Sequence, residues 1–168
     1  RSGSYHSCAE PFNSRDQHTT NIDAPGTPAI CARLVDGSGR YRAAAVQMSS
    51  GPDRAANVAR ATALVREAAA RGARLIVLPE VFAWRGPRDE EAAAAEPIPG
   101  PITAALGALA RELRIYLCAG SLLERAPGEA RAFNTSCVFD PDGVLVARYR
   151  KVHLFDVDLP GRVSVRES

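Results

Sequence analysis

Apolar positions along the chain separate two regions that meet near residue 41. Residues 1–40 are rich in Ser, Asn, Thr, Gly and Pro, and they show neither the three- to four-residue step of an amphipathic helix nor the alternation of a strand. We therefore expect residues 1–40 to be disordered, or to be a leader foreign to the domain that follows. Residues 41–168 carry regular apolar patterns and form the expected folded domain.

The apolar pattern after residue 41 predicts strands and helices in alternation. Short continuous apolar runs are typical of buried strands, whereas apolar residues at three- and four-residue steps indicate helices with one buried face. The segment 88–96, rich in Ala and Glu, is expected to be a surface helix or loop. The predicted order is strand 43–48, helix 53–73, strand 74–80, a helix that opens with Pro101, and strands 115–121, 133–139 and 144–150. This order favours an α/β fold whose sheet is covered by helices and is parallel in its first part.

Charge and composition argue against several classes of function. The net charge of +2 over 168 residues gives no basic stripe, which argues against a nucleic-acid or membrane-surface partner. No apolar run is long enough to span a bilayer. Four cysteines follow no metal-ligand spacing, and His6, Cys8, His18 and Cys31 match no known ligand pattern. We expect a cytoplasmic protein with reduced thiols.

Two charged residues follow predicted strands directly. Glu80 comes after the run "LIVLP" and Lys151 comes after "VLVARYR". Taken alone, each has an ordinary interpretation as a solvated charge at a strand end. Apolar neighbours on both sides favour a second interpretation, in which the two charges pair at the carboxyl end of the sheet, where α/β proteins bind ligands.

Several motifs carry a family resemblance. "RLIVLPEVF", "RYRKVHLFD" and "VRES" are similar to the N-terminal half of the nitrilase superfamily, the carbon–nitrogen hydrolases, and "AAVQM", "AEPIPGP" and "AFNTSCVFDPDG" support the match. Residues 41–168 then form a partial carbon–nitrogen hydrolase domain. The segment "KVHLFDVDLPG" most resembles the branch of ω-amidases and deaminated glutathione amidases.

The resemblance implies a fold, a site and a reaction. The fold would be the N-terminal half of an α-β-β-α sandwich, truncated, from a protein that forms homo-oligomers when complete. By motif, Glu80 matches the general base, Lys151 the cation that stabilises the oxyanion, and Glu167 a second carboxylate that orients the site. The substrate would be a small-molecule amide, and no metal or organic cofactor is implied. We also predict that the charged groups of Glu80 and Lys151 converge in a cleft, with Glu167 nearby.

The family nucleophile has no match in these residues. In the family it is a Cys that lies C-terminal to the Lys and the second Glu, whereas Cys118 and Cys137 both precede Lys151. The sequence therefore indicates a fragment of a hydrolase. Whether this chain is an enzyme by itself stays an open question. A non-catalytic remnant or an assembly module of the same fold is the alternative. A nucleotide-binding module is a weaker one, since "DGSGRY" lacks the third glycine of that motif.

Overall fold

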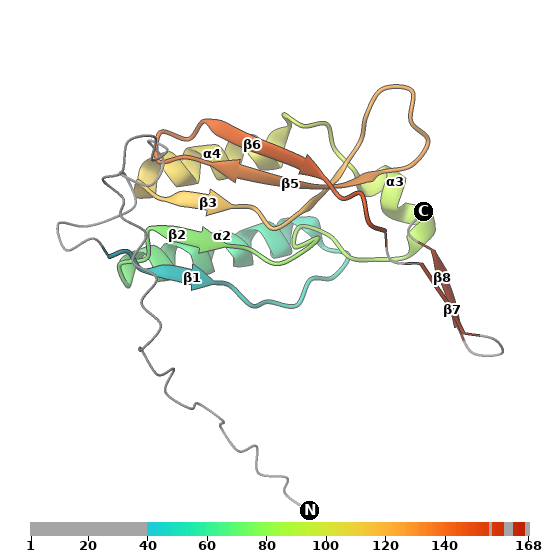
Figure 1. Ribbon diagram of the computed structural model, residues 1–168, viewed down its shortest axis with the longest axis horizontal. Helices are drawn as coiled ribbons and strands as arrows, with labels where there is room; N and C mark the ends of the chain where they lie inside the picture. The colour runs from blue at the N-terminus through green and yellow to red at the C-terminus, as the bar shows by residue number, and fades with distance from the viewer. Residues whose placement is uncertain (1–39, 155, 160–162, 167–168) are drawn as a thin grey trace, which may run out of the picture. The chain divides into compact units, whose positions relative to one another are not determined.

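The computed structural model describes residues 40–154, 156–159 and 163–166, and its main feature is a six-stranded mixed sheet (Figure 1). Strands β1, β2 and β3 pair in parallel, whereas β5 pairs antiparallel with β3, β4 and β6. The predicted parallel first part is thus confirmed. The strand bounds are β1 Ala43–Ala45, β2 Leu75–Val77, β3 Tyr116–Cys118, β4 Leu122–Glu124, β5 Phe133–Phe139 and β6 Leu145–Arg150.

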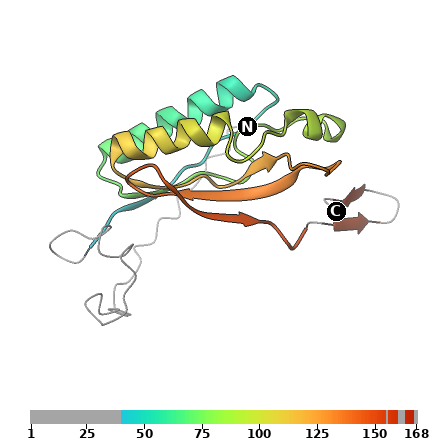
Figure 2. The same cartoon turned by 90° about the horizontal axis from the view of Figure 1, so that it is seen from above.

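Two helices, α2 (Arg54–Ala70) and α4 (Pro101–Leu113), cover one face of the sheet, as Figure 2 shows. The carboxylate of Asp53 caps α2 by accepting the backbone N–H of Ala56 at 3.0 Å. Pro101 opens α4, where its missing N–H breaks no helical hydrogen bond. Both predicted helices are therefore confirmed, with ends that differ by a few residues. Among the described residues, no helix combines the length and hydropathy needed to cross a membrane.

The hydrophobic core lies between these helices and the sheet. Its most enclosed large side chains are at most 3% exposed, and they include Val65 and Leu106 from the helices and Ile76, Leu117 and Phe139 from the strands. Burying each such side chain stabilises the fold by about 1.5–3 kcal/mol. The core therefore fixes the strands whose ends carry the candidate site.

The predicted strand 115–121 contains β3, and a bend at its end leads into a further strand, β4, which was not predicted. β3 and β4 follow each other along the same side of β5, with Leu117 opposite Phe139 and Leu122 opposite Thr135. Between them Gly120 has a φ of +58°, a left-handed conformation that a strand cannot contain. The bend was not predicted, because the apolar pattern continues through it.

The expectation for residues 88–96 holds only in part, and a strand pair near the C-terminal end was not predicted. Residues 88–96 form a short 3₁₀ turn, Arg88–Glu90, and helix α3, Glu91–Ala94, which falls within the expected helix or loop. The end of this segment is not on the surface, however, because Glu96 is buried. In addition, β7 (Asp156–Leu159) pairs antiparallel with β8 (Val163–Arg166).

Candidate active site

Glu80 lies just beyond the carboxyl end of β2, on a constrained backbone. The next residue, Val81, has a φ of +49°, a left-handed conformation that is unfavourable for a β-branched side chain. The Val81 N–H donates to the Ser121 hydroxyl at 2.9 Å, which helps to hold this conformation. Strain of this kind is found where the surrounding structure fixes a functional residue. The turn therefore gives Glu80 a defined direction.

Lys151 lies just beyond β6 and reaches the same place. Its backbone N–H donates to the Asn134 carbonyl at 2.8 Å, which continues the pairing of β5 with β6. Its ammonium Nζ lies 3.0 Å from Glu80 Oε1. The prediction that the charged groups of Glu80 and Lys151 converge is confirmed, although 71 positions separate them in the sequence.

Asn134 also contacts the Glu80 carboxylate. Its side-chain Nδ2 donates to Glu80 Oε1 at 2.8 Å, so that one carboxylate oxygen accepts from both an amide and an ammonium. The ion pair remains accessible to water, since the side chain of Glu80 is 50% exposed and that of Lys151 is 28% exposed. A carboxylate that can accept a proton therefore lies beside a cation that can face developing negative charge.

These side chains line a cleft of about 700 Å³. This volume lies within the range of roughly 300–1,000 Å³ that is usual for small-molecule sites. The wall combines apolar groups with charges of both signs. Its main residues are Glu80, Val81, Trp84, Arg85, Arg88, Glu91, Leu123, Asn134, Lys151 and Leu154. The cleft can therefore hold a small molecule against Glu80 and Lys151.

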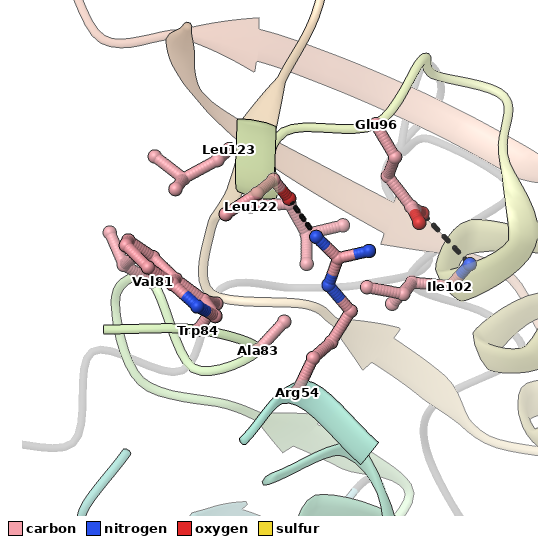
Figure 3. Close-up of a pocket in the computed structure, with 9 residues that line it drawn as sticks. Arg54, Val81, Ala83, Trp84, Glu96, Ile102, Leu122 and Leu123 are labelled. Carbon is pink, nitrogen blue, oxygen red and sulfur yellow. Dashed lines mark hydrogen bonds between the residues drawn. The ribbon is translucent and has the colours of Figure 1, made fainter. Parts of the chain in front are cut away.

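A smaller cavity lies behind one wall of this cleft (Figure 3). Val81, Trp84 and Leu123 line both spaces, and Arg54 of α2 donates across the small cavity to the backbone carbonyl of Ala94. With a volume of about 10 Å³ it has room for little more than one water molecule, which is too small for a substrate. The residues around this small cavity pack the wall of the cleft against α2.

Glu96, also drawn in Figure 3, fixes the start of α4 beside this cavity. Its Oε1 accepts the backbone N–H of Ile102 at 2.8 Å, and the Glu96 side chain is buried. A carboxylate at a helix N-terminus satisfies a backbone donor that has no partner inside the helix. The role of Glu96 is therefore structural.

The two cysteines in the described part of the chain do not line the cleft. Cys137 is fully buried, and burial raises the pKa of its thiol to about 11. A thiol of this kind is mostly protonated at neutral pH, and the thiolate is the nucleophilic form. Cys118 lies on β3 beside Ser136, at 4.0 Å between Sγ and Oγ. Neither cysteine thus contributes to the wall of the cleft, and the statement that neither is the nucleophile stays a prediction.

Alkylation of Cys137 should be slow in the folded chain. With a pKa of about 11, roughly one thiol in a thousand is ionised at pH 8, and the core also blocks the reagent. We expect iodoacetamide to modify Cys137 at least about 100-fold more slowly than in urea, with a rate that rises as the pH increases towards 11. Peptide mapping by mass spectrometry measures this, and the urea-unfolded chain is the control. Equal rates in the folded and unfolded states would contradict the buried placement.

Several residues singled out in the sequence lie outside the described residues. These are Glu167 and the four positions His6, Cys8, His18 and Cys31, so their roles stay predictions. In the part of the chain that the structure describes, no cluster of His, Cys, Asp and Glu could hold a metal ion.

Sequence reasoning missed Asn134 and the buried Glu124. A signal for Asn134 was present in the two predicted strands 133–139 and 144–150. Their antiparallel pairing brings the start of the first strand, with Asn134, next to the end of the second, where Lys151 follows.

Comparison with known proteins gives consistent matches. The model of the carbon-nitrogen hydrolase family matches residues 42–168. Human Omega-amidase NIT2 is 42% identical over 128 residues, which are 76% of this chain and 46% of that protein. Omega-amidase NIT2 of Danio rerio is 42% identical over 129 residues, with the same 46% coverage. The chain therefore spans just under half the length of these curated relatives.

Solved structures of related proteins also resemble this chain in fold. The NitFhit protein of C. elegans superposes with a TM-score of 0.65 and 32% identity, over 74% of this chain and 31% of that one. Nit3 of Saccharomyces cerevisiae, a member of the nitrilase superfamily, superposes with a TM-score of 0.59 and 33% identity, over 65% of this chain and 43% of that one.

Proposed function

The chain belongs to the carbon-nitrogen hydrolase family of the nitrilase superfamily, and we propose that its Glu80 and Lys151 serve the hydrolysis of a small amide. The family resemblance and the α/β class predicted from the sequence are confirmed by the family match and the nitrilase-superfamily neighbours. The observation that supports the roles most strongly is the contact of Lys151 Nζ with Glu80 Oε1 at 3.0 Å inside the cleft. Two charges so far apart in sequence meet where a substrate can reach both.

The proposed reaction proceeds through a thioester. Glu80 takes the proton of a cysteine thiol, and the thiolate attacks the amide carbon. Lys151 stabilises the oxyanion that forms, and the C–N bond breaks as Glu80 returns the proton to the departing ammonia. Water activated by the same carboxylate then attacks the thioester, which releases the acid and restores the thiol. Glu167 is proposed to orient this site, and no metal or organic cofactor takes part.

We propose that the nucleophilic cysteine lies outside these 168 residues. For Cys118 and Cys137 the support is their position, because neither lines the cleft and the pKa of Cys137 is raised to about 11. Cys8 and Cys31 also precede Lys151 in the sequence, which does not match the order of the family motif. If the nucleophile lies outside this chain, the active unit is a longer protein or an assembly of several chains. We include a homo-oligomer in this proposal. The alternative is a non-catalytic assembly or binding module of the same fold.

We propose that the substrate is a short ω-amide that carries a carboxylate. The most similar curated proteins reported above are named omega-amidases. The charges of the cleft support this class. Among the described residues of the cleft wall, Glu80 and Lys151 are paired with each other, and the two guanidinium groups of Arg85 and Arg88 then outnumber the carboxylate of Glu91. The cleft wall thus has an excess of positive charge that suits an anionic substrate.

Reversing this charge should weaken substrate binding. In an active protein that contains this chain, we expect Arg85→Glu together with Arg88→Glu to raise KM for α-ketoglutaramate by roughly 10- to 100-fold, about 1.4 to 2.8 kcal/mol, because two favourable charges become unfavourable. The effect should shrink as salt is added. Arg60→Glu is the matched control, since Arg60 lies on α2 and does not line the cleft. An unchanged KM in the double variant would argue against an anionic substrate.

Ammonia release decides between the enzyme and its alternative. The active protein should release ammonia from α-ketoglutaramate, and the isolated 168-residue chain should not, because the proposed nucleophile is elsewhere. Absence of turnover in any protein containing this chain, over a panel of amides and nitriles, would favour the assembly module. Activity of the isolated chain that disappears with Cys118→Ala or Cys137→Ala would show that the nucleophile is one of these cysteines.

A further inference from the structure

A second carboxylate, Glu124 at the end of β4, is buried next to the strand ends that carry the candidate site. Its side chain is 1% exposed and it accepts hydrogen bonds from three side chains. The Arg150 guanidinium binds both carboxylate oxygens, with Nε 3.1 Å from Oε2, and Thr135 Oγ1 donates to Oε2 at 2.6 Å. Arg148 donates to Oε1. The reaction proposed above makes no use of this network.

Two of the three partners of Glu124 are immediate neighbours of the site residues. Arg150 precedes Lys151, and Thr135 follows Asn134. Thr135 and Arg150 are also directly opposite each other in the pairing of β5 with β6. Successive side chains of a strand point to opposite faces of the sheet. One face therefore presents Thr135 and Arg150 to Glu124, and the other presents Asn134 and Lys151 to Glu80.

Two further contacts make this arrangement rigid. The Arg150 guanidinium carbon lies 4.0 Å from the centroid of the Phe133 ring, so that Arg150 is held by an aromatic face as well as by a carboxylate. Arg148 also donates to the backbone carbonyl of Ile98 at 3.1 Å, which connects β6 to the segment before α4. Arg148 and Arg150, on the same side of β6, are thus each held by two different groups.

We propose that Glu124 is a positioning residue for the candidate active site. By fixing Arg150 and Thr135 on one face of the sheet, it sets the backbone positions from which Lys151 and Asn134 reach Glu80 on the other face. The catalytic consequence rests on the proposed function, whereas the geometric statement does not.

The charge of Glu124 is part of this role. Burial by itself raises the pKa of its carboxyl group, but the hydrogen bonds from Arg150 and Thr135 and the charges of Arg148 and Arg150 outweigh burial and hold the pKa below its usual range. The carboxylate therefore stays ionised at neutral pH. Replacing it with a neutral amide leaves two guanidinium groups next to each other without their counter-ion, and they should move apart.

The first experiment tests the geometry in the 168-residue chain itself. We expect Glu124→Gln to separate Lys151 from Glu80, so that in a crystal structure of the variant neither Lys151 Nζ nor Asn134 Nδ2 lies within hydrogen-bond distance of Glu80 Oε1. Glu124→Asp keeps the charge and should keep both hydrogen bonds. Glu112→Gln is the matched control. It makes the same Glu-to-Gln change in an exposed ion pair, between Glu112 of α4 and Arg66 of α2. Retention of both hydrogen bonds to Glu80 in Glu124→Gln would overturn the proposal.

The second experiment measures the kinetic consequence in an active protein that contains this chain. Glu124→Gln should lower kcat on the order of 100-fold, since a misplacement of about 1 Å can cost that much, and should leave KM within a few-fold. Glu124→Asp should recover most of kcat. A purely structural role would lower the amount of folded protein and leave kcat per folded molecule unchanged, and that result would also overturn the proposal.

A second variant covers the case in which Glu124→Gln does not fold. Arg150→Lys keeps a cation beside Glu124 but removes the two-pronged hydrogen bond and the planar contact with Phe133. It should lower kcat about tenfold or more without changing KM.

The proposed function and the positioning role of Glu124 can fail separately. If Lys151→Met has no effect on turnover, the proposed function fails. If Lys151→Met abolishes turnover while Glu124→Gln and Arg150→Lys leave kcat unchanged, the positioning role fails.

Discussion

Replacing Glu80 with Gln or Lys151 with Met should each lower turnover of a short ω-amide at least about a thousandfold in an active protein that contains this chain. Glutamine cannot take the thiol proton, and methionine cannot stabilise the oxyanion. KM should change little, because both groups are proposed to act mainly in the transition state. Steady-state ammonia release measures both effects.

The double variant gives the sharper result. Because Glu80 and Lys151 are in direct contact at 3.0 Å and are proposed to act in one step, Glu80→Gln with Lys151→Met should be only slightly slower than either single variant. Thermal melting is the control. An ion pair this exposed contributes about 1 kcal/mol or less, so the variants should remain folded at the assay temperature. Losses that multiply in the double variant would contradict a joint role.

Gly120→Ala should have the largest effect on the free energy of unfolding among simple glycine substitutions near the site. A Cβ at Gly120 would lie 2.0 Å from the Pro79 carbonyl oxygen and 2.4 Å from that of Leu78, and its φ of +58° already disfavours a side chain. The backbone before Glu80 would have to move. We expect a loss of about 3 kcal/mol or more in urea unfolding, together with loss of turnover in an active protein.

Gly128→Ala is the matched control for this substitution. Gly128 also has a positive φ, of +80°, but no atom lies within 4 Å of a Cβ built there. It therefore reports the cost of the left-handed backbone alone, about 1–2 kcal/mol. If Gly120→Ala costs no more than Gly128→Ala, then the close approach of Gly120 to the Pro79 backbone is not important for stability, and the bend does not hold the backbone before Glu80.

The sequence predicted those features whose cause is local. Helices α2 and α4 were predictable because their apolar residues repeat at helical steps, and Asp53 and Pro101 are recognisable start signals. Glu80 and Lys151 were recognisable because each interrupts an apolar run at a strand end. Their meeting could be expected from the rule that sites form at the carboxyl ends of strands.

The features that the sequence did not predict depend on contacts between distant residues. Glu124 looks like the polar end of an apolar run, and only the folded sheet brings Arg148, Arg150 and Thr135 to it. The bend at Gly120 depends on the close approach of the Pro79 carbonyl, far earlier in the chain, which no local pattern encodes. The tertiary structure thus determines the surroundings of the two charges that the sequence identified.

A crystal structure of Glu80→Gln with a short ω-amide bound, in an active protein that contains this chain, is the most direct test of the central claim. This variant cannot complete the reaction, so the substrate should remain whole. The account predicts that the amide carbonyl oxygen lies about 3 Å from Lys151 Nζ, with the amide in the cleft lined by Trp84 and Asn134. An amide bound elsewhere, or one in this cleft whose carbonyl oxygen does not approach Lys151, would contradict it.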